Sequence, residues 1–201
     1  MEQIYTQIRQ YIDENRQPML NLWRDLVNTE SGTLQIDGVN AVCSILRREM
    51  ENAGIHTRVR AIQNSGDMLI GEWNPGSSKA PLLLIGHMDT VFKEGAAKEN
   101  PLRVDENGMA HGPGVLDMKS GLVSAIWSMK AYKDLGIDPG KCLRMVINGD
   151  EEIRSPESSS IICEQAQGCK AALVCEPCTS NGDLKTGRKG SIGFEITIHG
   201  K

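Results

Sequence analysis

The chain has 201 residues, with 22 Lys and Arg against 26 Asp and Glu, which gives a formal net charge of −4. This length suits one domain of ordinary size with a real hydrophobic core. The mild acidity argues against a nucleic-acid or anionic-membrane partner, because such partners require a concentrated basic face.

The N-terminal residues 1–17 are polar and lack the apolar core of a signal peptide. The longest aliphatic run, Leu82–Ile85, is far too short to span a bilayer. Six cysteines in a chain without a secretory signal are expected to stay reduced. We therefore expect a cytoplasmic protein with no membrane partner.

The first half of the chain predicts one helix and several strands. Residues 38–53 carry apolar side chains at helical spacing, and Gly54 is a natural C-terminal stop. Residues 55–62 and 68–73 read as strands. Residues 80–86 are continuously apolar, which is typical of a fully buried strand. A hairpin is expected at 102–104 and 109–110.

The second half predicts a helix over 119–135, ended by Gly136, with its inner face formed by Leu122, Ile126, Met129 and Tyr132. It continues with a buried strand over 143–148, a short helix over 158–167 and a third buried strand over 171–175. Strands that alternate with helices at this spacing indicate an α/β domain. We expect a largely parallel sheet with helices on both faces.

Residues 193–199 alternate apolar and polar side chains, which predicts a half-exposed strand. The sequence stops two residues later, with no partner strand and no covering helix. The expectation is an interrupted chain rather than a finished domain.

Acidic or imidazole side chains follow three of the predicted buried strands, and a further acid precedes the long helix. They are His87, Asp89, Asp117, Asp150, Glu151, Glu152 and Glu176. Because ligands bind outside the carboxyl ends of strands in α/β sheets, these side chains are expected to converge. One histidine with several carboxylates suits catalytic Zn²⁺ or Mn²⁺, and an acid such as Asp117 can bridge two ions.

Each residue also has a simpler reading. His87 alone is compatible with an ordinary hydrogen-bonded histidine, although Asp89, two residues on, suits a carboxylate that orients a metal-bound ring. Asp117 alone fits an N-cap of the helix that follows it. The acids at 150–152 fit a solvated loop, and Glu176 fits a turn before Pro177. Their shared position at strand ends favours one common site.

Cys175 and Cys178 form a CxxC motif, which occurs in structural zinc sites and redox pairs. No second CxxC or CxxH follows at finger spacing. The cysteines are therefore interpreted as small packing residues around Glu176.

Four motifs carry a family resemblance. GHMDTVF (86–92), GPGVLDMKSG (112–121), NGDEE (148–152) and CEP (175–177) resemble the di-zinc exopeptidases typified by glutamate carboxypeptidase. That family includes acetylornithine deacetylase and succinyl-diaminopimelate desuccinylase. The resemblance covers about residues 80–200 and implies a three-layer α/β/α catalytic domain.

The resemblance also implies a role for each motif residue. His87 is similar to the ligand of one zinc, with Asp89 as its partner, and Glu176 to the remaining ligand of that zinc. Asp117 corresponds to the carboxylate that bridges both metals. Glu151 resembles the general base, and Glu152 a ligand of the second zinc. Asp150 matches no catalytic role in the family, and we expect it to be a turn residue bonded to backbone N–H groups. Manganese or cobalt are alternative metals.

The implied activity is hydrolysis of an amide next to a C-terminal amino acid, in a small peptide or N-acyl amino acid. A deacylase of N-acyl amino acids and a non-catalytic scaffold of the same fold are the alternatives. Residues 1–190 correspond to the N-terminal part of the catalytic domain, and 191–201 to a first strand leading into a lid or dimerisation domain. Since the family's last zinc-binding histidine lies beyond that domain, we expect this chain to be nearly inactive and the full-length protein to be a homodimer.

Overall fold

The computed structural model describes residues 2–187, 189–190 and 192–200. The helices are α1 (Glu2–Glu14), α2 (Arg16–Val27), α3 (Ile36–Asn52), α4 (Ala96–Glu99), α5 (Ser120–Asp134) and α6 (Ser159–Ala166). The strands are β1 (His56–Arg60), β2 (Gly66–Trp73), β3 (Leu82–His87), β4 (Arg103–Val104), β5 (Ala110–His111), β6 (Leu143–Gly149) and β7 (Ala171–Val174). Two short helical turns, η1 (Val115–Lys119) and η2 (Glu151–Ile153), follow β5 and β6.

Five strands form the central sheet in the order β1-β2-β6-β3-β7, and β4 and β5 form a separate hairpin. β3 runs parallel to its neighbours β6 and β7, whereas β2 runs antiparallel to β1 and β6. The predicted parallel sheet is therefore right for the half that carries the candidate site and wrong for the other half. The short connection between β1 and β2 explains why these two strands are antiparallel, because parallel neighbours require a long crossover.

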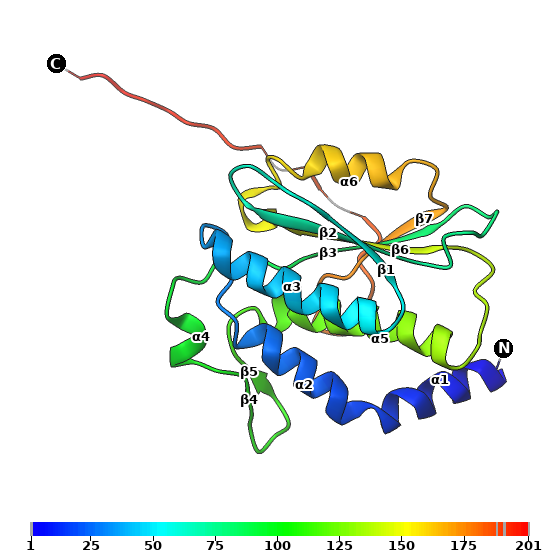
Figure 1. The fold of residues 1–201 in the computed structure, drawn as a ribbon. Coiled ribbons are helices and arrows are strands. Elements are labelled where there is room, and N and C mark those ends of the chain that lie inside the picture. The colour runs from blue at the N-terminus through cyan, green and yellow to red at the C-terminus, as the bar shows by residue number, and fades with distance from the viewer. Residues whose placement is uncertain (1, 188, 191, 201) are drawn as a thin grey trace.

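Helices cover both faces of the sheet (Figure 1). α3 and α5 lie against one face, and α1 and α2 pack on the outer side of these two helices. α6 lies on the opposite face. The predicted three-layer α/β/α arrangement is confirmed.

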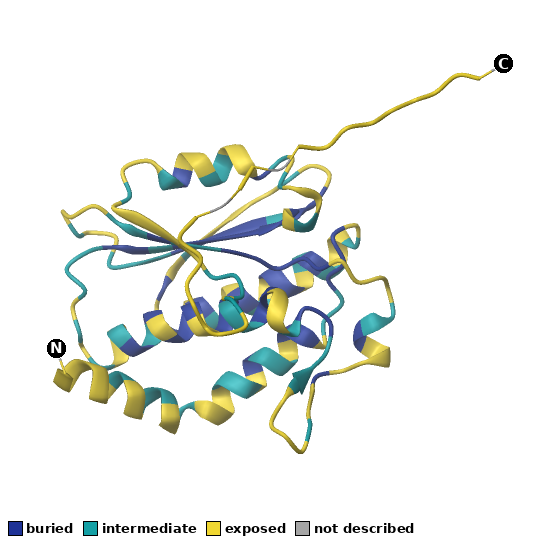
Figure 2. Ribbon diagram, turned by 180° about the vertical axis from the view of Figure 1, so that it is seen from behind, coloured by how far each residue is buried: buried dark blue, intermediate teal, exposed yellow. Residues whose placement is uncertain are grey.

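Buried apolar side chains concentrate where α3 and α5 meet the sheet, as the dark blue segments in Figure 2 show. They include Val39, Val42, Leu46 and Met50 on α3, and Leu122, Ile126 and Met129 on α5. These are the inner faces predicted from helical spacing. Gly54 and Gly136 follow the two helices with φ of 70° and 65°, a left-handed conformation that glycine adopts without steric cost.

β7 is more exposed than its apolar sequence indicates. Leu173 and Val174 expose 54% and 58% of their surface, so the prediction of a buried strand over 171–175 is wrong in burial although right in secondary structure. The strand lies at the end of the sheet order and is paired with β3. β3 itself is only partly buried, since Leu83 is fully covered and Leu84 is half-buried.

Residues 192–200 have no regular secondary structure and are exposed throughout, running away from the sheet (Figure 1). The strand predicted over 193–199 is therefore wrong, and the apolar side chains of Phe194 and Ile196 expose 85% and 81% of their surface. No described strand lies beside this segment, and an unpaired strand leaves its backbone groups without partners. Residues 191 and 201, the ends of the predicted outgoing segment, lie outside the described residues.

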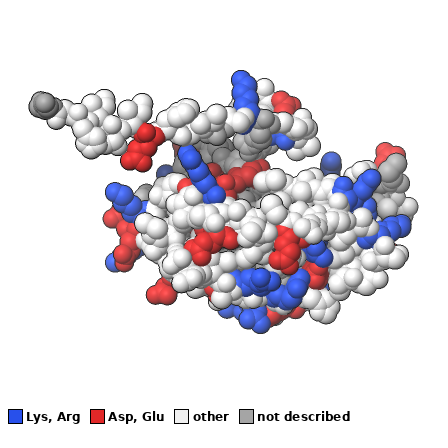
Figure 3. Space-filling view, turned by 90° about the horizontal axis from the view of Figure 1, so that it is seen from above, with Lys and Arg blue, Asp and Glu red and all other residues white. Residues whose placement is uncertain are grey.

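On the face in Figure 3, Lys and Arg side chains are interspersed with Asp and Glu side chains. Among the described helices, none combines the length and the apolar character needed to cross a membrane.

Candidate metal centre

His87 is the last residue of β3, and its side chain is 1% exposed. In the parallel pairing of β3 with β6, it lies opposite Asn148. The preceding residue must be small, because a Cβ at Gly86 would lie 2.8 Å from side-chain atoms of both Met118 and Leu122. α5 and the turn before it therefore pack directly on the strand end, and this contact fixes the place of the imidazole.

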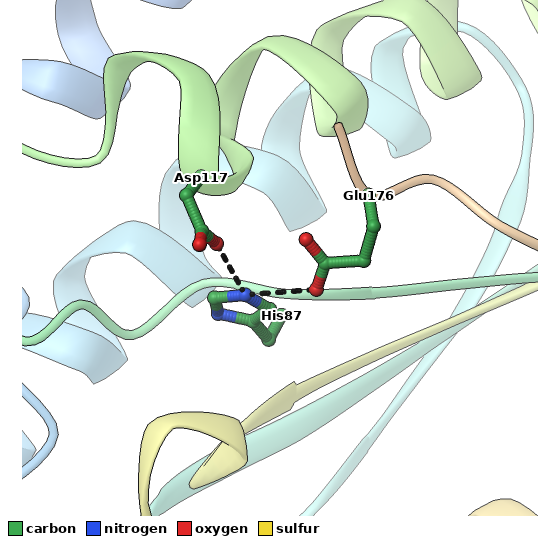
Figure 4. Close-up of side chains that lie close together, drawn as sticks. All are labelled: His87, Asp117 and Glu176. Carbon is green, nitrogen blue, oxygen red and sulfur yellow. Dashed lines mark hydrogen bonds and ion pairs between the residues drawn. The ribbon is translucent and has the colours of Figure 1, made fainter. Parts of the chain in front are cut away.

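Two carboxylates meet the same nitrogen of His87 (Figure 4). Nε2 lies 3.1 Å from Oδ1 of Asp117 and 3.3 Å from Oε1 of Glu176. One ligand atom of each residue lies within 4.8 Å of the other two. Metal–nitrogen and metal–oxygen distances at zinc are about 2.0–2.2 Å, so one ion among these atoms can contact all three. The structure thus brings together three of the four predicted ligands.

Asp117 belongs to η1 and does not cap the helix that follows. α5 begins at Ser120, its N-cap residue is Lys119, and no side chain caps it. The Asp117 side chain is 60% exposed and points toward His87. The N-cap reading is therefore wrong. The peptide bond between Asp117 and Met118 is cis.

Glu176 is positioned from two directions. Its neighbour Cys175 continues the strand pairing, with its backbone N–H donating a 2.8 Å hydrogen bond to the carbonyl of Ile85. On the other side, the first turn of α5 presses against the same residue, because a Cβ at Gly121 would lie 1.9 Å from the Cys175 carbonyl oxygen. Glycine at this position lets the helix approach, and the approach fixes the backbone that carries Glu176.

Asp89 lies two residues beyond β3 and is fully buried. Its Oδ1 is 3.3 Å from Nδ1 of His87, the ring nitrogen that faces away from Asp117 and Glu176, and the backbone carbonyl oxygen of Asp89 lies 3.0 Å from the same nitrogen. Oδ2 accepts a 2.7 Å hydrogen bond from the hydroxyl of Thr33. The backbone N–H groups of Glu151 and Glu152 each donate to this carboxylate at 3.2 Å. Asp89 therefore ties the histidine to the acidic turn η2.

The pKa of Asp89 reflects this environment. Burial raises it, but the hydrogen bonds from His87 and Thr33, together with the histidine charge, hold it below its usual value. The carboxylate is thus kept ionised and orients the ring, as expected of a carboxylate behind a metal-bound histidine.

The three consecutive acids differ in environment. Asp150 is fully buried and accepts hydrogen bonds from the backbone N–H groups of Glu157 and Ser158, both at 3.1 Å. It also accepts from the Ser158 hydroxyl and, at 2.9 Å, from the Asn148 amide. The prediction that Asp150 is a turn residue bonded to backbone N–H groups is confirmed.

Glu151 faces the histidine, with Oε2 3.9 Å from Nε2 of His87 and 47% of its side chain exposed. Glu152 is held through its backbone by Asp89, but its carboxylate does not join the close group formed by His87, Asp117 and Glu176. Burial raises the pKa of both glutamates, the His87 charge lowers it, and the surrounding carboxylates raise it further. Both side chains therefore hold a proton more readily than an exposed glutamate does.

The charge balance at His87 favours a cation. Burial lowers the pKa of His87, but hydrogen bonds and charge interactions with Asp89 and Glu176 raise it to about 11. The carboxylates around the ring therefore favour a positive charge on the imidazole. A divalent cation that replaces the proton would bring a larger positive charge to the same carboxylates.

Two residues tied to the site were not found from the sequence. Thr33 reaches Asp89 from the segment between α2 and α3. Lys119 is buried and donates to carbonyl groups at the end of α2. Lys119 lies inside the motif GPGVLDMKSG, although the motif gave it no role. No local sequence pattern connects Thr33 with Asp89, which lies 56 positions away. All six cysteines are free. Cys175 packs against the core, as the packing interpretation predicts, but Cys163 and Cys178 are exposed, so the interpretation is wrong for these two.

A cavity of about 430 Å³ opens beside Glu152. Its walls come from residues 32–35, residues 90–94 and η2, and the lining includes the exposed side chains of Leu34, Val91 and Phe92. The cavity has the size and the mainly apolar lining of small-ligand sites.

Residues 83–199, more than half of the chain, match the family described as peptidase family M20/M25/M40. The chain belongs to this family. The matched M20/M25/M40 region begins in β3 and contains His87, Asp117, Glu151, Glu152 and Glu176. The resemblance inferred from the four motifs is confirmed.

Two curated relatives of the chain carry different names. The chain is 35% identical over 180 residues to carboxypeptidase G2 of Pseudomonas sp. (strain RS-16), covering 88% of this chain and 43% of that protein. It is 27% identical over 196 residues to succinyl-diaminopimelate desuccinylase of Stutzerimonas stutzeri (strain A1501), covering 92% of this chain and 50% of that protein. The chain thus spans half or less of these relatives' length.

Solved structures support the M20/M25/M40 fold. The di-peptidase Dug1p from Saccharomyces cerevisiae superposes with a TM-score of 0.73 at 19% identity, over 84% of this chain and 40% of that one. The M20 family metallo-carboxypeptidase Sso-CP2 from Sulfolobus solfataricus superposes with a TM-score of 0.64 at 18% identity, over 78% of this chain and 36% of that one. At these identities the likeness concerns the fold alone.

Proposed function

We propose that this chain carries most of the catalytic centre of a metal-dependent hydrolase that cleaves an amide bond next to a C-terminal amino acid. The observation that supports this proposal is the arrangement of carboxylates around Nε2 of His87. Asp117 and Glu176 meet Nε2 as a compact ligand group, while Glu151 stands 3.9 Å from the same nitrogen and outside that group. A ligand set with an additional carboxylate beside it is what metal-assisted hydrolysis requires.

The donor set fits a divalent transition-metal ion. One imidazole nitrogen and two carboxylate oxygens within 4.8 Å of one another are ligands that zinc accepts in catalytic sites, and manganese or cobalt can replace it. His87, Asp117 and Glu176 would hold the first ion. Glu152 would hold a second ion, with Asp117 shared between the two.

The bound ions would polarise the amide carbonyl and make water a stronger acid. Glu151 would accept the proton from the attacking water as its oxygen adds to the carbonyl carbon, and would deliver it to the amine nitrogen when the C–N bond breaks. Asp89 would keep the His87 ring in place throughout.

The cavity beside Glu152 would receive the substrate group next to the scissile bond. Its lining by Leu34, Val91 and Phe92 favours a group with an apolar body. The name carboxypeptidase G2 supports cleavage beside a C-terminal amino acid. The name of the desuccinylase supports the second candidate, removal of an N-acyl group from an amino acid.

The test compares the zinc-loaded protein with Glu151→Gln. The variant is expected to keep its zinc content and to lose about 10²–10⁴-fold in kcat on an N-acylated dipeptide with C-terminal glutamate. A variant that hydrolyses the substrate at the normal rate would remove Glu151 from the proposed role. Parallel assays with N-acetyl and N-succinyl amino acids separate the carboxypeptidase from the deacylase. Because the chain spans half or less of these relatives' length and is expected to be nearly inactive, absence of cleavage does not by itself favour the scaffold alternative. A zinc content that is unchanged in His87→Ala would favour it.

A further inference from the structure

Thr33 stands apart from the family motifs, yet its side chain enters the site. The residue is 7% exposed, and its hydroxyl donates a 2.7 Å hydrogen bond to Oδ2 of Asp89. This is the shortest of the contacts made by that carboxylate, since the ring nitrogen of His87 is 3.3 Å away and the two backbone donors are 3.2 Å away.

The backbone around Thr33 is anchored to the strand end that carries Asp89. The N–H of Thr33 donates to the carbonyl of Thr90 at 3.1 Å, and the N–H of Thr90 donates to the carbonyl of Ser31 at 2.8 Å. Gly32 lies so close to the same segment that a Cβ there would be 2.3 Å from the Phe92 carbonyl oxygen. The hydroxyl is therefore delivered to Asp89 by a backbone that has little freedom to move.

The carboxylate of Asp89 accepts three hydrogen bonds and also faces the His87 ring. An ionised carboxylate has about four lone-pair sites, and here Oδ1 faces His87 Nδ1 and the N–H of Glu151, while Oδ2 accepts from Thr33 and the N–H of Glu152. Loss of one donor frees a buried lone pair and lets the carboxylate plane turn. Such a turn moves the imidazole on one side and the η2 backbone on the other.

We infer that Thr33 is a positioning residue of the metal centre, which acts through Asp89 to fix both the His87 ring and the turn that carries Glu151 and Glu152. Thr33 does not belong to the ligand group, and its hydroxyl is directed to Asp89. The inference rests on the proposed metal-dependent function. It extends the histidine–carboxylate pair to a third member that comes from the N-terminal part of the chain.

The experiment measures Co²⁺ binding by the full chain, because the visible absorption of Co²⁺ reports ligand geometry without any need for turnover. Thr33→Val keeps the shape of the side chain and removes the hydroxyl, and Thr33→Ser keeps the hydroxyl. We expect Thr33→Val to bind Co²⁺ about 10–100-fold more weakly with an altered spectrum, and Thr33→Ser to match the wild type. Thr29→Val is the matched control, since the Thr29 hydroxyl bonds the Asp25 carbonyl in the same region and should leave binding unchanged.

Wild-type affinity and spectrum in Thr33→Val would overturn the inference while leaving the proposed function in place. Equal losses in Thr33→Ser and Thr33→Val would also overturn it, because the hydroxyl would then not be the group that matters. Should Thr33→Val fail to fold, Thr33→Ser still decides, since it must bind Co²⁺ as the wild type does. A wild-type chain that binds no Co²⁺ removes the proposed function and the inference together.

Discussion

The ammonium of Lys119 donates a 2.7 Å hydrogen bond to the carbonyl of Leu26 and a 3.2 Å bond to that of Thr29. Leu26 lies in the last turn of α2, where carbonyl groups have no partner within the helix and a positive charge is favourable. Lys119 lies two residues after Asp117 and is 1% exposed. This one side chain therefore joins the N-terminal helices to the turn that carries a candidate metal ligand.

The first prediction concerns the pH dependence of stability through Lys119. Burial lowers its pKa to about 7, although the charge of Glu30 raises it. In the unfolded chain a lysine titrates near 10.4, so between these values the unfolded state binds more protons and stability rises with pH, by at most about 1.4 kcal/mol per unit. Lys119→Met should lack this rise. Urea unfolding of both proteins at several pH values checks it, and parallel pH curves would contradict it.

The second prediction concerns proton release on metal binding. His87, with a pKa of about 11, is protonated in the metal-free chain at neutral pH, whereas a metal ligand must be a neutral imidazole. Zinc uptake should therefore release about one proton, and the apparent affinity should rise about tenfold per pH unit in the neutral range. Calorimetry in two buffers with different ionisation enthalpies measures the proton. Zinc binding with no proton release would show that His87 is neutral before the ion arrives.

The third prediction separates Asp150 from its neighbour. Asp150→Ala removes an acceptor shared by the buried N–H of Ser158, the Ser158 hydroxyl and the Asn148 amide, so it should lower the free energy of unfolding by roughly 2–4 kcal/mol. Glu151→Gln changes a half-exposed side chain and should alter stability by less than about 0.5 kcal/mol. Chemical unfolding of the two variants compares them directly. Equal stability losses would mean that the acids share one role.

The fourth prediction concerns Gly121. Replacing a helical glycine with alanine normally stabilises a helix by about 1 kcal/mol, but here the new Cβ would lie 1.9 Å from the Cys175 carbonyl oxygen. Gly121→Ala should therefore destabilise the chain and weaken zinc binding, because the displaced backbone carries Glu176. Gly76→Ala is the control, since a Cβ at Gly76 meets nothing within 4 Å. If Gly121→Ala left stability and zinc affinity unchanged, the backbone at Cys175 would be free to move away from the helix.

Much of the fold was accessible from the sequence because local patterns determine it. Apolar spacing located α3 and α5, and Gly54 and Gly136 marked their ends. The burial of β7 and the direction of β2 were not accessible in this way. Both depend on which strands become neighbours, and a run such as Ala-Ala-Leu-Val has the same composition at an edge as at the centre of a sheet.

The candidate site was likewise only partly predictable from the sequence. His87 and Glu176 could be located because each lies at or just beyond the end of an apolar strand, and parallel strands end together. Thr33 could not, since it acts across 56 residues, and Lys119 acts across 93. These supports come from tertiary contacts made by a hydroxyl and an ammonium group that have no special local sequence pattern.

The ligand atoms of the candidate centre come from β3, η1 and Glu176, which follows β7. Only the folded chain brings them within 4.8 Å of one another. A cation with affinity for this native arrangement alone must shift the folding equilibrium by mass action. The gain is about 2.7 kcal/mol when the free ion is at one hundred times its Kd. The midpoint of thermal unfolding should therefore rise with the logarithm of zinc concentration, so that melting curves report the occupancy of the site.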